Sequence, residues 1–133
     1  MALEFKKSDQ DTVTKVATDF LSYYYDNLNS KNYNNILPYL KKFTWASMNK
    51  NRYNGDNLLD YFKIFNQIDA NFSNIDFDTL HSGAKRINIL VSGIISFKNE
   101  NGKKENKNFS EYIHCGTSKE GEFWIQTIIF KLI

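Results

Sequence analysis

The stretch RINILVSGIISFKNENGKKENKNFSEYIHC, residues 86–115, decides the fold class of this chain. Apolar and polar residues alternate on both sides of a central polar segment, and this period of two is typical of half-buried β-strands. The Asn101-Gly102 pair in that segment is a strong short-range signal for a tight hairpin turn. The sequence therefore predicts two long antiparallel strands, over 86–97 and 107–115, joined by a turn.

Helical and strand patterns flank this hairpin. Apolar residues between Val13 and Leu28 recur at the spacing of an amphipathic helix, and shorter helices are expected at 33–40, around Pro38, and at 56–65. Strands are expected at 42–47, 71–80 and 122–132, with a turn at 51–56. Three N-terminal helices packed on one face of a sheet of three or four antiparallel strands predict a single α+β domain over residues 1–133.

Composition narrows the classes of function. The 133 residues, of which 16% are aromatic, suffice for a core without disulfides or metals. The one cysteine favours a reducing compartment, and the scattered formal charge of +2 argues against direct nucleic-acid binding. The longest apolar run, INILVSGII (87–95), is about half the roughly 20 residues that cross a bilayer, so membrane insertion is not expected.

The last strand, FWIQTIIFKL (123–132), raises the question of what covers the second face of the sheet. Strict alternation places Ile128 on the core face and Ile129 on the opposite face, so both faces are apolar, whereas helices can cover only one. A mixed apolar and polar second face is typical of a protein interface. The predicted interface residues are Leu90, Ser92, Ile94, Tyr112, His114, Ile125, Thr127, Ile129 and Lys131.

Signals for catalysis and metal binding are weak. The sequence has no P-loop, no Rossmann glycine pattern, no nucleophile motif and no paired cysteines. His114 and Cys115 are neighbours in a strand and therefore point to opposite faces. The inward positions are interpreted as offering Gln126 and Cys115 without an ionisable acid, and tyrosines 23–25 as packing residues. No catalytic residue, metal site or cofactor is expected, and the chain is expected not to be an enzyme.

The order of these segments resembles the nuclear transport factor two family. The resemblance is carried by ATDFLSYYYDNL (17–28), FTWASMNKNRYNGDNLLDYF (43–62), the hairpin at 89–113 and FWIQTIIFKL (123–132). It implies a cone-like fold in which three helices wrap a strongly bent sheet. It also implies that the outer face of the sheet forms a dimer.

Three functions compete within this resemblance. The homodimeric Ran-GDP import carrier has an acid directly after the strand tryptophan and acids at the end of the long strand. This chain has Ala46 and Lys98 at these positions, with Glu100 nearby. In the small subunit of the mRNA export receptor, a basic residue ends the last strand, and Lys131 matches it. An isomerase or dehydratase would need an acid or histidine inside the cone. Ile128 stands where the transport families usually have aspartate, which is a departure from the family pattern.

The sequence favours the second of these functions, a non-enzymatic nuclear transport protein. As the small subunit of a heterodimer it would stabilise the large subunit of the mRNA export receptor and help the pair bind phenylalanine-glycine nucleoporins. The expected locations are the nucleus, the nuclear pore and the cytoplasm. The Ran-GDP carrier, which pairs with itself, is the alternative, and the isomerase or dehydratase is the second alternative.

Overall fold

The computed structural model describes residues 10–81, 85–117 and 122–133. Its first half contains helix α1 (Gln10–Asn29), 3₁₀ turns at Tyr33–Asn35 and Leu37–Tyr39, strands β1 (Leu40–Met48) and β2 (Asn51–Asn54), a 3₁₀ turn at Gly55–Asn57 and helix α2 (Leu58–Gln67). Its second half contains strands β3 (Asn71–His81), β4 (Arg86–Lys98), β5 (Lys104–Thr117) and β6 (Phe123–Leu132). The predicted α+β class is confirmed.

The described strands form one sheet in the order β2-β1-β6-β5-β4-β3. Neighbouring strands are antiparallel except β1 and β6, which run parallel. The sheet is therefore mixed and has more strands than the sequence predicts. The difference arises because β6 returns beside β1, a strand far away in the sequence, and alternation within either strand does not reveal this pairing.

Strand β2 begins where the sequence predicts a turn. The turn lies two residues earlier, because Asn49 and Lys50 both adopt positive φ, at 49° and 74°. Two such residues form a tight hairpin connection, which brings Asn51 back against Met48. The short strand β2 thus becomes one edge of the sheet.

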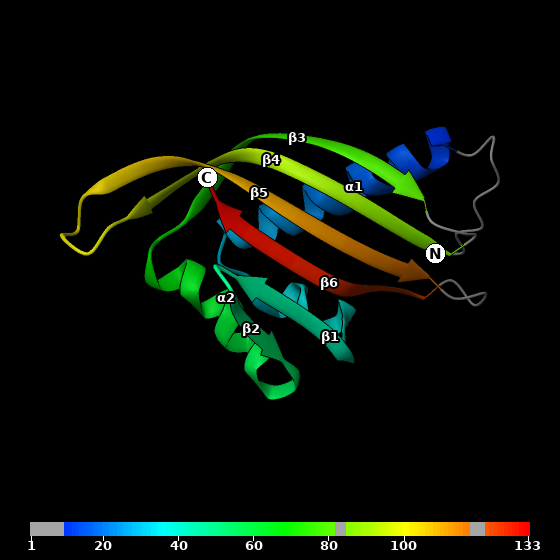
Figure 1. Cartoon of the computed structure of the whole chain (residues 1–133), viewed down its shortest axis with the longest axis horizontal. Coiled ribbons are helices and arrows are strands. Elements are labelled where there is room, and N and C mark those ends of the chain that lie inside the picture. Colours follow the sequence, from blue (N-terminus) through cyan, green and yellow to red (C-terminus); the bar gives the residue numbers. More distant parts are fainter. Residues whose placement is uncertain (1–9, 82–84, 118–121) are drawn as a thin grey trace.

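The helices lie on one side of the strongly bent sheet (Figure 1). Helix α1 crosses behind β3 to β6, and α2 packs against β1 and β2. The ends of β4 and β5 extend past the other strands as a long hairpin, which we call the arm. The sheet side away from α1 is called the outer face, and the opposite side the inner face.

The inner face forms the core. On β4 and β5, Ile87, Ile89 and Ile113 are fully buried, as the alternation predicts. Deeper in the cone four phenylalanine rings form a closed cycle with centroid distances of 5.2 to 5.4 Å, and each contact adds about 0.5–1.5 kcal/mol beyond simple burial. These rings belong to Phe65 of α2, Phe72 of β3, Phe109 of β5 and Phe130 of β6.

A β-bulge reverses the two faces along β6. His114 pairs with Thr127 but Cys115 pairs with Ile125, so Gln126 is an extra residue without a partner on β5. Before the bulge, Ile125 points inward and is 0% exposed. The prediction that Ile125 belongs to the interface on the outer face is therefore wrong, and Gln126 lies at the bulge itself, outside the regular alternation. One inserted residue shifts every preceding side chain to the other face.

Gly93 lies where the pairing of β3 with β4 is irregular. A Cβ at this position would lie 2.8 Å from Phe109 Cε1 and 2.9 Å from the carbonyl oxygen of Ser73. The register of β3 against β4 shifts just beyond this contact, between Ser73 and Asp76, and Asn74 has positive φ. The missing side chain thus permits close approach of the two strands.

Gly93→Ala should reduce the free energy of unfolding by about 1–3 kcal/mol, because the backbone carbonyl cannot move away as a side chain would. Urea denaturation measures the change, and Ser92→Ala on the exposed side of the same strand is the control. Equal stability of the two variants would show that the strands separate easily at this point.

Candidate functional site

The outer face carries the remaining predicted interface residues. Leu90 is 61% exposed and Ile129 is 38% exposed, and the register aligns both with Tyr112 in one row across β4, β5 and β6. Ser92 and Lys131 are exposed beside them, Ile94 is half-buried, and Thr127 at the bulge is 7% exposed. The structure therefore gathers these side chains on one surface.

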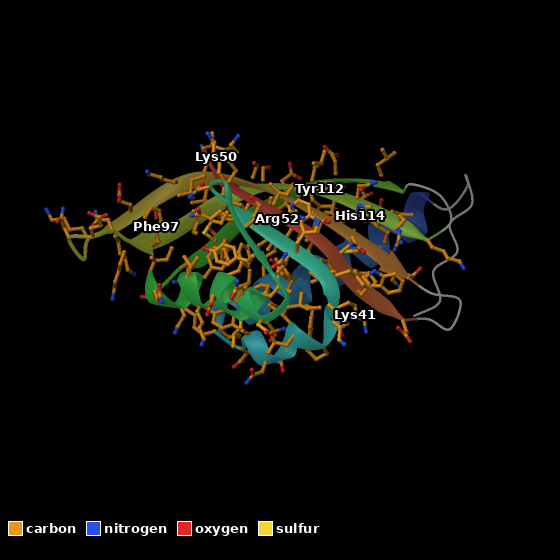
Figure 2. All side chains as sticks on the ribbon, turned by 60° about the horizontal axis from the view of Figure 1, so that its bottom comes forward. Lys41, Lys50, Arg52, Phe97, Tyr112 and His114 are labelled. Atoms are coloured by element: carbon orange, nitrogen blue, oxygen red, sulfur yellow. The ribbon has the colours of Figure 1, made fainter. Side chains whose placement is uncertain are left out.

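Tyr112 and His114 form a polar centre on this face (Figure 2). The Tyr112 hydroxyl donates to Asn88 Oδ1 at 2.6 Å and lies 3.4 Å from His114 Nδ1. Partial burial, assisted by the positive charge of Arg86, lowers the pKa of His114 and favours the neutral ring. Cys115 points into the core, where burial raises the pKa of its thiol, so it does not cooperate with His114.

A second candidate site lies inside the cone, around Glu111 of β5. This carboxyl group is 2% exposed and sits between Val91 and Phe130 on the neighbouring strands. Three tyrosine hydroxyls donate to it: Tyr24 to Oε2 at 3.1 Å, Tyr61 to Oε2 at 3.4 Å, and Tyr25 to Oε1. We call these four residues the Glu111 cluster, which joins α1, α2 and β5.

The surroundings of Glu111 bring the pKa of its carboxyl group close to neutral pH. Burial raises the pKa of the carboxyl group from 4.5 to about 7, although the hydrogen bonds from Tyr25, Tyr24 and Tyr61 act in the opposite direction. Burial and then the charge of Glu111 raise the pKa of all three tyrosines well above 10. A carboxyl group with this pKa can accept and release a proton at physiological pH.

The sequence interpretation missed this cluster. Glu111 occupies the inward position between Phe109 and Ile113, so the alternation of β5 already contained the signal. Alternation was used for the apolar members of that face, Phe109, Ile113 and Cys115, and the tyrosines were expected to be packing residues. The statement that no ionisable acid points inward is wrong. The partners of Glu111 follow from tertiary packing, since Tyr24 and Tyr25 precede it by 87 and 86 residues.

Tyr25 links the Glu111 cluster to the surface. Besides its hydrogen bond to Glu111, it lines a pocket of about 230 Å³ between α1 and β3. The same pocket is bordered by Leu21 and Asp26 of α1 and by Phe77 of β3. The Tyr25 side chain is therefore shared between this pocket and the buried carboxyl group.

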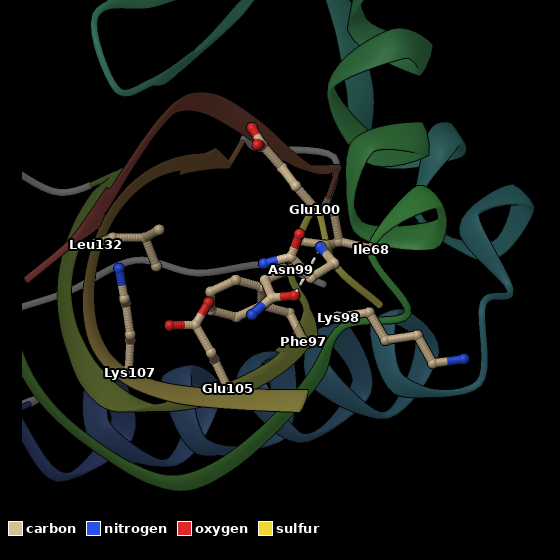
Figure 3. A pocket seen from close by; sticks show the side chains of 9 residues that line it. Ile68, Phe97, Lys98, Asn99, Glu100, Glu105, Lys107 and Leu132 are labelled. Atoms are coloured by element: carbon tan, nitrogen blue, oxygen red, sulfur yellow. Dashed lines mark hydrogen bonds between the residues drawn. The ribbon is translucent and has the colours of Figure 1, made fainter. Parts of the chain in front are cut away.

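A larger pocket, of about 450 Å³, lies where the arm leaves the body of the protein (Figure 3). Its rim carries charges of both signs and its floor is apolar. The charged residues are Lys98, Glu100, Glu105 and Lys107, and the apolar ones are Ile68, Phe97 and Leu132.

The positions at which the family resemblance places Ran-binding acids carry no carboxylate. Ala46 is fully buried on the inner side of β1. The Lys98 ammonium group lies 3.7 Å from a carboxylate oxygen of Asp69, so its positive charge is paired within this chain. Glu100 is the remaining acid, on the exposed turn of the arm.

The described residues contain neither a metal-binding cluster nor a membrane-spanning helix. In the ranges 10–81, 85–117 and 122–133, no three histidine, cysteine, aspartate or glutamate side chains come together as a metal-binding group. Every helix in these ranges is too short or too polar to cross a membrane.

The fold and the two sites define a small α+β protein in which a bent sheet and its helices enclose an aromatic interior. Nuclear transport factor 2 (Ntf2) from Cryptosporidium parvum has this fold, with a TM-score of 0.63, 17% identity and coverage of 100% of this chain and 99% of that one. A ketosteroid isomerase-like protein from Erwinia carotovora atroseptica has a TM-score of 0.75 at 10% identity, over 96% and 98% of the two chains. The hexachlorocyclohexane dehydrochlorinase LinA-type3 from Novosphingobium barchaimii has a TM-score of 0.79 at 9% identity, over 96% and 90%.

These similarities establish the cone-like fold of the nuclear transport factor 2-like proteins. No protein-family model matches the sequence, and no curated protein matches it. The sequence-based expectation excluded an enzyme, and this exclusion is wrong. Enzymes share this fold, and an ionisable group, Glu111, does lie inside the cone. Fold alone does not decide between transport and catalysis, so the function rests on the sites.

Proposed function

We propose that this chain is a nuclear transport protein that pairs, through the outer face of its sheet, with the large subunit of an mRNA export receptor. The observation that carries the proposal is the exposure of Leu90 and Ile129 on the uncovered sheet face. Exposed aliphatic side chains beside tyrosine and histidine are typical of an interface centre with a polar rim. Ntf2 shares the fold over the full length of both chains, so the fold is compatible with this function.

In this proposal the chain acts as a structural subunit. It stabilises the related domain of the large subunit, and the pair binds phenylalanine-glycine nucleoporins while moving between nucleus, nuclear pore and cytoplasm. Lys131, exposed at the end of β6, contributes a positive charge to the contact. A lysine supplies charge without the two-pronged geometry of arginine, so its own contribution is modest.

Co-expression with the sheet domain of the large subunit from the same organism tests the proposal. The expected result is a complex of one copy of each chain that remains intact during size-exclusion chromatography. A stable homodimer that fails to bind the large subunit would contradict it.

Ran-GDP should bind weakly or not at all. Losing one member of a buried interfacial charge pair costs roughly 2–5 kcal/mol, and the lysine at position 98 adds repulsion against a basic partner. Isothermal titration calorimetry with purified Ran-GDP measures this directly. Micromolar binding by a homodimer would make the chain an import carrier instead.

A second candidate function, proton transfer on a small molecule, is favoured by the Glu111 cluster. Its carboxyl group has a pKa of about 7 and would take up the proton. Its three tyrosine hydroxyls already donate to Glu111, so their role is to hold the carboxyl group in place. Incubation with a panel of ketones in D₂O, followed by proton NMR, detects exchange at the carbon next to the carbonyl group. Exchange that is lost in Glu111→Gln would support this function, and equal spectra with and without protein would contradict it for that class of substrate.

A further inference from the structure

The chain contains two arginines and two tryptophans, and each arginine lies on a tryptophan. The guanidinium carbon of Arg52 is 4.3 Å from the ring centroid of Trp45, and that of Arg86 is 5.4 Å from the ring centroid of Trp124. We call these pairs the Arg52 stack and the Arg86 stack. All four residues belong to the outer face, because Trp45 alternates with the buried Ala46 and Trp124 lies opposite Gly116.

The Arg86 stack depends on a glycine. Arg86 extends from β4 across Gly116 of β5 to Trp124 of β6, and a Cβ on Gly116 would collide with the guanidinium group and come within 2.6 Å of the Trp124 ring. The exposed ring of Phe43 meets Trp124 edge-on at 6.3 Å. The arginine is therefore held in a fixed position by its neighbours.

Two buried nitrogens beside this stack lack hydrogen-bond partners. They are Trp124 Nε1 and His114 Nε2, both covered from solvent and unpaired within the described structure. A buried N–H group without an acceptor is costly, and Trp124 Nε1 is such a group, whereas the role of His114 Nε2 depends on the tautomer of the ring. Around Arg86 the outer face thus offers guanidinium donors for which the described residues supply no carboxylate.

The positive charges of both stacks are also unpaired. Neither Arg52 nor Arg86 has an ion-pair partner among the described residues. A guanidinium group ordered on an aromatic ring keeps its N–H edge free, and its planar fork fits a carboxylate with little further loss of side-chain entropy. On the described strands, the acids of the outer face are Asp76 and Asp78, which lie on β3 at the edge of the sheet.

We propose that the two stacks are anchor points for carboxylate side chains of the partner protein that covers the outer face. The proposal rests on the proposed heterodimer and specifies its chemistry. Trp45 pairs with Thr127, three residues after Trp124, so the two anchor points are about 10 Å apart along the strands. The partner is thus a sheet surface with two separate acidic residues around an apolar centre that meets Leu90 and Ile129.

This pattern favours a different protein over a second copy or RNA. In a symmetric pair the acids on the described strands of this face are Asp76 and Asp78, which are two residues apart on one edge strand and cannot serve both anchor points at once. RNA would meet the same two aspartates and the exposed aliphatic side chains of the face, neither of which suits phosphate. A protein with its own carboxylates satisfies all of these groups.

Arginine footprinting provides the direct test, because the chain has two arginines and each reports one stack. The purified complex with the sheet domain of the large subunit is labelled with p-hydroxyphenylglyoxal and compared with the free chain by mass spectrometry. Protection of both Arg52 and Arg86 in the complex is expected. Full labelling of both in an intact complex would overturn the proposal.

Binding measurements with variants complete the test. Arg86→Gln and Arg52→Gln should each weaken the complex about 30-fold or more, and the lysine variants should restore little because they lack the planar fork. Lys63→Gln on α2 removes the same charge from an exposed position elsewhere and should have no effect. Circular dichroism checks the folding of each variant, and footprinting of the wild-type complex does not depend on any of them.

The outcomes separate this inference from the proposed function. If Ile129→Glu abolishes the complex while both arginine variants bind normally, the face is the interface but the stacks are not anchor points. If the chain alone sediments as a dimer that protects both arginines, the partner is a second copy and the inference fails. Protection by a single-stranded RNA oligonucleotide, without binding to the large subunit, would also overturn it.

Discussion

Replacing Ile129 by glutamate should abolish the heterodimer and leave the monomer folded. The side chain is 38% exposed in the isolated chain, so a carboxylate at this position can remain in water. In the complex it would be buried at the centre of the outer face, where its cross-strand neighbours Leu90 and Tyr112 carry no positive charge. An unpaired buried charge costs several kcal/mol, so affinity should fall at least about 100-fold.

Size-exclusion chromatography of the co-expressed chains measures the loss, and circular dichroism measures the fold of the variant alone. Thr14→Glu is the matched control, because it adds one carboxylate to an exposed position of α1 on the opposite side of the sheet. If the Ile129 variant is unfolded as a monomer, the residue belongs to the core and the outer face has been misassigned. If it is folded and still binds, the partner uses another surface.

Glu111 should make the stability of the protein depend on pH in a direction unusual for a carboxyl group. Its pKa rises from 4.5 to about 7 on folding, so between these values the folded state holds a proton that the unfolded state has lost. The contribution of this group to the free energy of unfolding is fully present below pH 4.5, declines as pH rises and is lost above about pH 7. A shift of this size corresponds to about 3 kcal/mol.

The variant Glu111→Gln cannot ionise and should lack this decline. The difference in the free energy of unfolding, variant minus wild type, should therefore increase by about 3 kcal/mol between pH 4.5 and pH 7.5. Urea denaturation at these two pH values measures it, and Glu100→Gln on the exposed arm is the matched control. A difference that does not change with pH would show that Glu111 is ionised throughout and stabilised by its tyrosines.

Much of the fold follows from local sequence patterns. The period of two over residues 86–115 and the Asn101-Gly102 turn predict the long hairpin and the buried side of β4. The same alternation places Leu90 and Tyr112 on the outer face, where the structure has them. These features are predictable because the direction of a side chain in a regular strand depends on its position in that strand alone.

Irregular backbone limits this reasoning. The extra residue at Gln126 reverses the faces of β6, which moves Ile125 into the core and Trp124 to the outer face. Likewise, the positive φ values of Asn49 and Lys50 convert an expected turn into strand β2. A bulge or a turn of this kind changes the face to which every later side chain points. An apolar strand with two similar faces gives no signal of where this reversal occurs.

The sequence by itself determined the α+β class, the hairpin and the outward position of Leu90 and Ile129, because each depends on the periodicity of one segment. The tertiary structure alone decided the parallel pairing of β1 with β6, the Glu111 cluster and the two arginine stacks. These features join residues that are far apart in the chain, such as Tyr24 with Glu111 and Arg86 with Trp124. Distant pairings arise from the packing of helices and strands around a common core, which no single segment of the sequence encodes.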